Sequence, residues 1–184
     1  MKVKIDDLPP EGRTFEVEVE AGDLDQSLGP ERDPGLVWSG PAHGTITLNK
    51  AGRSLRVQGR TTFRFTEPCA RCLAEVDREE RATFDLTKRL GAEPDHPRTH
   101  EVRDDEVDED YLAEPEIDLT RVVLEQVALE LPQRVLCSES CKGLCPQCGA
   151  NLNQETCRCT TQTVDPRFAL LAKLRDDDGS PTDH

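Results

Sequence analysis

The feature that most constrains this chain is a concentration of cysteine toward its C-terminal end, where six of the eight cysteines fall within residues 137–159. Almost no large apolar residues accompany them, so the segment cannot bury enough surface to fold around a hydrophobic core. Closely spaced thiolates are instead typical ligands of a tetrahedral metal ion. We therefore expect this segment to fold around metal.

The centre of the segment is Cys145-Pro-Gln-Cys148-Gly149. Two thiolates separated by two residues and followed by glycine form a tight turn whose backbone N–H groups point at the sulfurs, which is half of a tetrahedral site. No histidine lies nearby, and the spacing differs from that of iron–sulfur proteins, so we expect at least one structural zinc ion. The sequence offers two pairs as the remaining ligands, Cys137 with Cys141 and Cys157 with Cys159.

A further pair, Cys69 and Cys72, lies between two segments with strand periodicity. A thioredoxin-type redox pair would place its first cysteine at a helix N-terminus, which the strand-like flanks disfavour. The pair either contributes to a second metal site, together with Cys157 and Cys159, or binds no metal. The spacing does not choose between these alternatives.

Length and hydropathy limit the remaining possibilities. The 184 residues suffice for one domain with an appendage. No apolar run resembles a membrane helix or a signal peptide, so we expect a cytoplasmic protein that uses no membrane. Thiols stay reduced in the cytoplasm, which favours metal ligands over disulfides.

Residues 55–66 alternate between apolar and polar side chains, which predicts a strand. One face of this strand carries Arg56, Arg60 and Arg64, about 13 Å apart from one to the next, and such a row can follow a phosphate backbone. We treat the three arginines as candidate RNA-binding residues. Alternatively, the face is only solvated and pairs with acidic residues of the following strand, namely Glu75, Asp77 and Glu79.

The periodicity predicts an α+β protein. An antiparallel β-sheet region ending in the C-x-x-C hairpin occupies residues 1–92, and polar residues at inward positions near 78–80 predict a bulge or a sheet edge. Asp118 is expected to cap a packing helix that ends at Pro132, and Asp165 a short C-terminal helix. The predicted regions are 1–92 (sheet), 93–117 (acidic linker), 118–175 (helix, zinc-knuckle segment and C-terminal helix) and 176–184 (acidic disordered tail).

The net charge of −14 is unevenly distributed. Residues 93–118 carry a net −10 and residues 176–184 a further −4, so the remainder is neutral. These acidic segments either serve solubility or recruit a basic partner.

Motifs of catalysis are missing from the sequence, which contains no phosphate-binding glycine loop, no serine nucleophile elbow and no H-E-x-x-H. We expect a protein that is not an enzyme and has no small-molecule substrate. A single tryptophan, a single tyrosine and five phenylalanines also disfavour RNA binding by base stacking, so RNA contact would rely on arginine and phosphate.

Three motifs together resemble a known family. They are E-P-C-A-R-C-L at residues 67–73, C-K-G-L-C-P-Q-C-G-A-N-L-N at residues 141–153, and D-P-R-F at residues 165–168. The chain resembles the YceD family of bacterial and plastid proteins, the large ribosomal RNA subunit accumulation proteins.

This resemblance implies a role in the accumulation or maturation of large-subunit ribosomal RNA. Two modes of action fit the residues. In the first, the arginine face and the zinc-knuckle segment bind ribosomal RNA or a pre-ribosomal particle. In the second, the acidic segments bind a basic large-subunit ribosomal protein. The net charge favours the second mode or a mixture of the two. The alternative function is a thiol-based redox or metal-handling protein.

Overall fold

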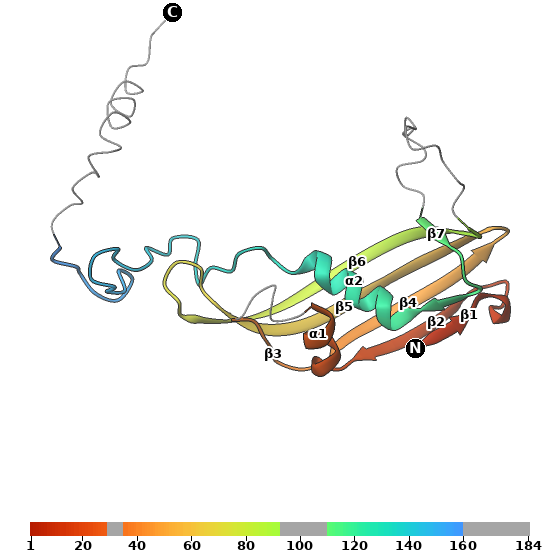
Figure 1. Ribbon diagram of the computed structural model, residues 1–184, viewed down its shortest axis with the longest axis horizontal. Coiled ribbons are helices and arrows are strands. Elements are labelled where there is room, and N and C mark those ends of the chain that lie inside the picture. Colours follow the sequence, from red (N-terminus) through yellow and green to blue (C-terminus); the bar gives the residue numbers. More distant parts are fainter. Residues whose placement is uncertain (29–34, 93–109, 160–184) are drawn as a thin grey trace, which may run out of the picture. The chain divides into compact units, whose positions relative to one another are not determined.

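The computed structural model describes residues 1–28, 35–92 and 110–159. The described residues form two helices, a short 3-10 turn and eight strands (Figure 1). The helices are α1 (Ala21–Leu28) and α2 (Leu119–Glu130), and the turn is Ile5–Asp7. The strands are β1 (Lys2–Lys4), β2 (Arg13–Val19), β3 (Val37–Trp38), β4 (Ala42–Ala51), β5 (Ser54–Pro68), β6 (Glu75–Leu90), β7 (Asp110–Leu112) and β8 (Glu116–Asp118).

The main sheet has the strand order β2-β4-β5-β6-β7, with the short β3 also paired to β5. Every pair is antiparallel except β6 with β7, which is parallel. A separate antiparallel ribbon joins β1 to β8. The predicted α+β class is confirmed, with the addition of one parallel pair that the sequence did not indicate.

One face of the sheet forms the hydrophobic core. Its centre is β5, where every second residue from Leu55 to Phe65 is buried except the half-buried Gly59, as the alternation predicted. Phe63, Phe65 and Trp38 form an aromatic cluster with ring centroids 6.1–6.2 Å apart. We call the opposite side of the sheet, which carries Arg56, Arg60 and Arg64, the polar face.

Helix α2 packs against the core face (Figure 1). The Asp118 side chain accepts a hydrogen bond from the Thr120 backbone N–H at 3.1 Å, which confirms the predicted N-cap. Gly44 on β4 allows the close approach, because a Cβ at this position would lie only 2.8 Å from a Val123 methyl group. The helix buries the predicted stripe: Leu119, Val122, Val123, Gln126 and Val127.

The long β5–β6 hairpin has no bulge. Its register is continuous from the Ser54–Arg89 pair to the Pro68–Glu75 pair, so the bulge considered for residues 78–80 does not occur. The other predicted possibility, a sheet edge, is correct for most of β6. Within the described residues β7 pairs with β6 only at Lys88–Leu90. Inward-facing polar residues are tolerated there because a sheet edge leaves them access to water.

The chain divides into two compact units, Met1–Cys141 and Lys142–His184, which we describe separately. The predicted region 118–175 contains parts of both, because α2 packs on the sheet of the first unit. The end of the predicted linker, residues 110–117, contains β7 and most of β8. The predicted C-terminal helix and acidic tail lie outside the described residues.

Candidate metal centres

The first unit brings together four cysteines that are distant in sequence. Cys69 and Cys72 lie in the turn between β5 and β6, and Cys137 and Cys141 lie in the segment after α2. We call this group the hairpin cluster. The Cys69 and Cys141 sulfurs are 3.9 Å apart, and those of Cys72 and Cys137 are 3.6 Å apart. Cys69, Cys72 and Cys141 are buried, whereas Cys137 is exposed.

Backbone and arginine contacts hold the two halves of the hairpin cluster together. The Ala70 N–H donates to the Val135 carbonyl at 2.9 Å. The Arg71 side chain donates from Nη1 to the carbonyls of Glu139, at 3.2 Å, and Cys141, at 2.8 Å. Both donors come from within the C-x-x-C turn, so the turn that supplies two sulfurs also positions the loop that supplies the other two.

The second unit contains a local group, Cys145, Cys148, Cys157 and Cys159, which we call the C-terminal cluster. The Cys157 sulfur lies 3.3 Å from that of Cys145 and 3.6 Å from that of Cys148. Gly149 adopts a φ of 74°, and its N–H donates to the Cys145 carbonyl at 2.9 Å, which closes the turn predicted from the sequence. Among these four residues only Cys145 is buried.

The geometry of both clusters fits a tetrahedral metal ion. The sulfurs of each cluster all lie within 4.8 Å of one another. Four ligands at a zinc–sulfur distance of about 2.3 Å define a tetrahedron with edges of about 3.8 Å, close to the separations of 3.3–3.9 Å found here. A disulfide would need about 2.05 Å, and all eight cysteines are free thiols. Each cluster can therefore hold one ion with four sulfur ligands.

Backbone hydrogen bonds prepare one thiolate in each cluster. The pKa of Cys69 is lowered to about 6, mainly by the backbone N–H of Cys137. The pKa of Cys145 is lowered to about 6, mainly by the backbone N–H groups of Cys148 and Gln147. N–H groups that point at a sulfur stabilise its charged form, which is the form that binds metal.

Neighbouring thiols instead raise the pKa of another cysteine in each cluster. Hydrogen bonding with Cys141 and Cys72 raises the pKa of Cys137 to about 12, and the pKa of Cys159 is raised to about 12 by Cys157 and Cys148. Four adjacent sulfurs cannot all become anionic without a cation among them. A positive ion bound in either cluster would allow all four of its sulfurs to be anionic.

Within each unit, the cysteines fall into one group of four whose sulfurs lie close together. Cys145 and Cys148 lie with Cys157 and Cys159, whereas Cys69 and Cys72 lie with Cys137 and Cys141. Each of these groups of four lies within one of the two units. The eight cysteines form four close pairs in the sequence, a signal for two sites that does not by itself assign the pairs.

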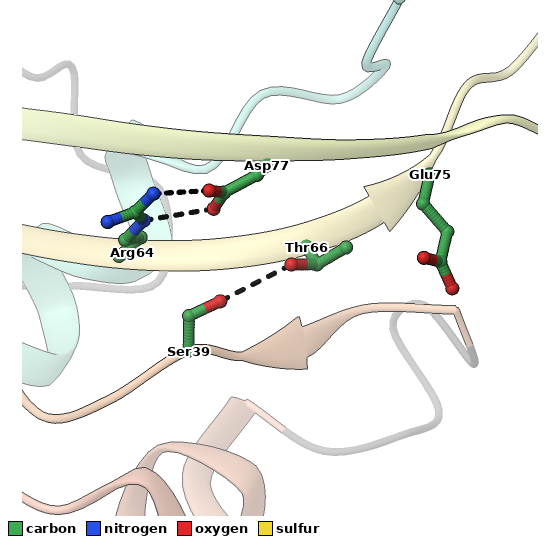
Figure 2. Close-up of a pocket in the computed structure, with 5 residues that line it drawn as sticks. All are labelled: Ser39, Arg64, Thr66, Glu75 and Asp77. Atoms are coloured by element: carbon green, nitrogen blue, oxygen red, sulfur yellow. Dashed lines mark hydrogen bonds and ion pairs between the residues drawn. The ribbon is translucent and has the colours of Figure 1, made fainter.

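The three candidate RNA-binding arginines differ from one another. Arg56 donates to both carboxylate oxygens of Asp85, at 2.9 and 2.6 Å. Arg64 forms the same two-bond pair with Asp77 (Figure 2), and the hydrogen bond lowers the pKa of that carboxyl. Arg60 has no ion-pair partner among the described residues. Asp77 was one of the acidic partners considered from the sequence, whereas Asp85 was not.

Arg64 and Asp77 also line a shallow cleft with Ser39, Thr66 and Glu75 (Figure 2). The Ser39 and Thr66 hydroxyls are 3.3 Å apart. Because the arginine is already paired with a carboxylate, this cleft offers no free cation to an anionic ligand.

None of the helices in residues 1–28, 35–92 and 110–159 is long and apolar enough to span a membrane.

The fold and the two clusters define an α+β protein with two four-cysteine sites suited to metal. The family model described as large ribosomal RNA subunit accumulation protein YceD matches residues 57–175. The chain belongs to the YceD family, as its motifs indicated.

Curated relatives come from bacteria and plants. An uncharacterized protein of Mycobacterium tuberculosis is 39% identical over 129 residues, which cover 70% of this chain and 59% of the relative. The Arabidopsis thaliana chloroplastic protein named large ribosomal RNA subunit accumulation protein YCED homolog 1 is 29% identical, over 74% of this chain and 49% of its own.

An uncharacterized protein of Bacillus subtilis is 35% identical, over 61% of this chain and 62% of its own. The chain thus spans about three fifths or less of the length of these relatives. No solved structure gives a significant match.

Proposed function

We propose that each cluster holds one structural zinc ion. Cys69, Cys72, Cys137 and Cys141 would bind the first, and the four cysteines of the C-terminal cluster the second. The separations between sulfurs support zinc, as does an all-sulfur donor set that leaves no position for a substrate. Bound in this way, zinc supplies cross-linking and charge neutralisation rather than chemistry at an open site.

We further propose that the protein is a non-enzymatic factor that supports accumulation or maturation of large-subunit ribosomal RNA, and that it acts by binding. The observation that carries this proposal is the family match over residues 57–175, because the family is described by that role. RNA or a pre-ribosomal particle is the first partner, and the cytoplasm of a bacterial cell is the expected location. Closed four-cysteine sites disfavour the redox alternative, since cycling thiols need an accessible thiolate.

A basic large-subunit ribosomal protein is the second candidate partner. The net charge of −10 over residues 93–118 supports it, because such a segment attracts a cationic protein. In this second mode the first unit, Met1–Cys141, which we call the sheet unit, would present the acidic segment. RNA would reach the complex only through the ribosomal protein.

Purification from growing cells separates these modes. A tagged chain is crosslinked at low salt, and the bound RNA is sequenced while the bound proteins are identified. Large-subunit ribosomal RNA, enriched over a tag-only control, is expected; recovery of neither this RNA nor a ribosomal protein would exclude the proposed function. Elemental analysis of the same preparation is expected to give two zinc ions per chain, and a metal-free protein with intact fold would exclude the zinc assignment.

A further inference from the structure

The arginines of β5 recur at every fourth position, and the sheet pairs the outer two in the same way. Arg56 lies opposite Thr87 and Arg64 lies opposite Glu79. Each reaches diagonally to the β6 residue two positions before its direct partner, which is an aspartate in both cases. On the polar face, therefore, both outer arginines are neutralised by the same kind of diagonal ion pair with an aspartate.

The central arginine, Arg60, has no aspartate at the corresponding diagonal position. Arg60 lies opposite Thr83, and the residue two positions before Thr83 is Arg81. Two arginines thus occupy the diagonal where the outer pairs hold an arginine and an aspartate. Diagonal residues on neighbouring antiparallel strands are about 7–8 Å apart, within reach of long side chains. The centre of the polar face consequently contains two adjacent cations.

These two cations are poorly neutralised. Both side chains are exposed. The nearest carboxylate to Arg81 is that of Glu79 on its own strand, at 3.9 Å, the long limit for an ion pair. Arg60 has none among the described residues. Since adjacent like charges destabilise a sheet, this arrangement costs stability, which the long contact of Arg81 with Glu79 offsets only in part.

The surroundings of the pair are mostly hydroxyl groups. Thr62 lies opposite Arg81, and Thr45 lies opposite Arg60 on the β4 side. The other charges near the pair have their own partners: Asp85, also diagonal to Arg60, accepts from Arg56, His43 pairs with Glu18 at 3.3 Å, and Glu16 accepts from the Thr45 hydroxyl at 3.0 Å. Both glutamates belong to β2, whose backbone lies two strands, about 10 Å, from that of β5, and within the described residues neither carboxylate forms an ion pair with Arg60.

We propose that Arg60 and Arg81 form a contact site for the phosphodiester backbone of RNA. This inference rests on the proposed function and narrows it to two residues, one of which the sequence did not single out. A guanidinium group binds phosphate oxygens through two parallel hydrogen bonds, and two such groups can hold one or two neighbouring phosphates. The aromatic residues of β3 and β5 lie on the core face, so their rings offer bases no stacking surface beside this site.

Contact through phosphates fixes position without reading sequence. The site would therefore add affinity and orientation, and selection of ribosomal RNA would come from elsewhere in the complex. The outer arginines, held by Asp85 and Asp77, would contribute little, because an incoming phosphate would have to displace a two-bond carboxylate pair.

The test compares two double variants that remove the same charge from the same face. Arg60→Gln with Arg81→Gln removes the proposed site, and Arg56→Gln with Arg64→Gln is the matched control. Each zinc-loaded full chain is titrated with a short single-stranded RNA of mixed sequence at several salt concentrations. Zinc content and circular dichroism confirm that both variants keep the fold.

We expect the first variant to bind RNA about tenfold more weakly and with a flatter salt dependence, since each lost phosphate contact reduces the slope of log affinity against log salt by roughly 0.7. The control should stay within about twofold of the unchanged chain. Equal losses in both variants would overturn the proposal, because binding would then depend only on overall charge. Binding by the unchanged chain that neither variant weakens would also overturn it.

The cellular purification distinguishes this outcome from failure of the proposed function. If the unchanged chain recovers large-subunit ribosomal RNA and the Arg60 and Arg81 variant recovers as much, only the proposed site is wrong. If the unchanged chain neither recovers RNA in cells nor binds it in solution, the RNA mode itself is excluded and the inference falls with it.

Discussion

The two cysteine clusters differ in what they connect. The sulfur contacts of the hairpin cluster join residues 72 and 65 positions apart, whereas those of the C-terminal cluster join residues 12 and 9 positions apart. A cross-link removes more conformational freedom from the unfolded chain when the loop it closes is longer. A metal ion bound at the first cluster would therefore stabilise a tertiary structure, whereas one bound at the second would organise only its own loop.

The two clusters also differ in how deeply they are buried and in whether a hydrophobic core lies beside them. Three of the four hairpin cysteines are buried, and the sheet unit has a hydrophobic core that can persist without metal. In the C-terminal cluster one cysteine is buried, and residues 142–159 contribute no apolar side chain to a hydrophobic core. The first ion would thus add to an existing fold, whereas the second would be the reason that its segment folds at all.

The strongest test of this contrast removes the hairpin ligands. Cys69→Ser with Cys72→Ser is expected to lose one zinc ion per chain and about 4 kcal/mol of stability, the entropic value for opening a loop of this length. In calorimetry the Tm of the sheet unit should fall by about 10 °C or more. An unchanged Tm with one zinc lost would show that the hairpin cluster does not stabilise the sheet unit.

The matching change in the other cluster should leave the sheet intact. Cys145→Ser with Cys148→Ser is expected to lose one zinc ion and to unfold residues 142–159, a local loss of about 3 kcal/mol on the same loop argument. Amide exchange should become fast in that segment, while the Tm of the sheet unit stays the same. Unchanged zinc content in this double variant would contradict the ligand assignment.

Arg71 offers a smaller and more selective test. A zinc ion with four thiolates carries a net charge of −2, and Arg71 brings a cation and two hydrogen bonds to the loop of the hairpin cluster. Arg71→Met is expected to weaken zinc at that cluster about 10- to 100-fold, as for other residues that orient metal ligands. Competition with a chromogenic chelator measures both affinities in one chain.

Arg158→Met is the matched control, because Arg158 lies between Cys157 and Cys159 and is exposed like Arg71, but among the described residues its side chain donates no hydrogen bond to a cluster loop. It should leave the hairpin cluster unaffected. If Arg71→Met weakened both clusters equally, its effect would be one of general charge, and the role of Arg71 in positioning the loop would be excluded.

Local signals in the sequence predicted the elements that local physics determines. The cap at Asp118 and the apolar stripe of α2 follow from spacing within one helix, and the burial of β5 follows from alternation within one strand. The turn at Cys145-Pro-Gln-Cys148 is equally local. In each case the residues that decide the structure lie within a few positions of one another.

Features that depend on distant segments could not be predicted in the same way. The partners of Cys69 and Cys72 depend on where the chain arrives after α2, about 65 residues later. The pairing of Arg56 with Asp85 depends on the register of the hairpin, which the length of its turn sets. Helix α1 and the parallel strand β7 carried no periodic signal long enough to identify them.

The two C-x-x-C turns allow the finest comparison, because the residue after the second cysteine makes the same backbone hydrogen bond in both but is leucine in one and glycine in the other. In both, the residue after the second cysteine donates its N–H to the carbonyl of the first, at 2.9 Å. That residue has a positive φ in each case, 74° at Gly149 and 60° at Leu73. A left-handed conformation costs a non-glycine residue roughly 1–2 kcal/mol, and Leu73 is 65% exposed, so burial does not offset this cost.

Opposite substitutions should therefore have opposite effects. Leu73→Gly is expected to stabilise the sheet unit by about 0.5 kcal/mol, because relief of strain exceeds the flexibility that glycine adds to the unfolded chain. Gly149→Ala should weaken zinc at the C-terminal cluster by about 1 kcal/mol. Calorimetry measures the first and chelator competition the second. Leu73→Ala, which keeps the backbone strain and removes most of the side chain, is the control and should leave stability unchanged. A loss of stability in both Leu73 variants would mean that the exposed leucine makes a stabilising contact. Backbone strain would then not be the reason that the two turns differ.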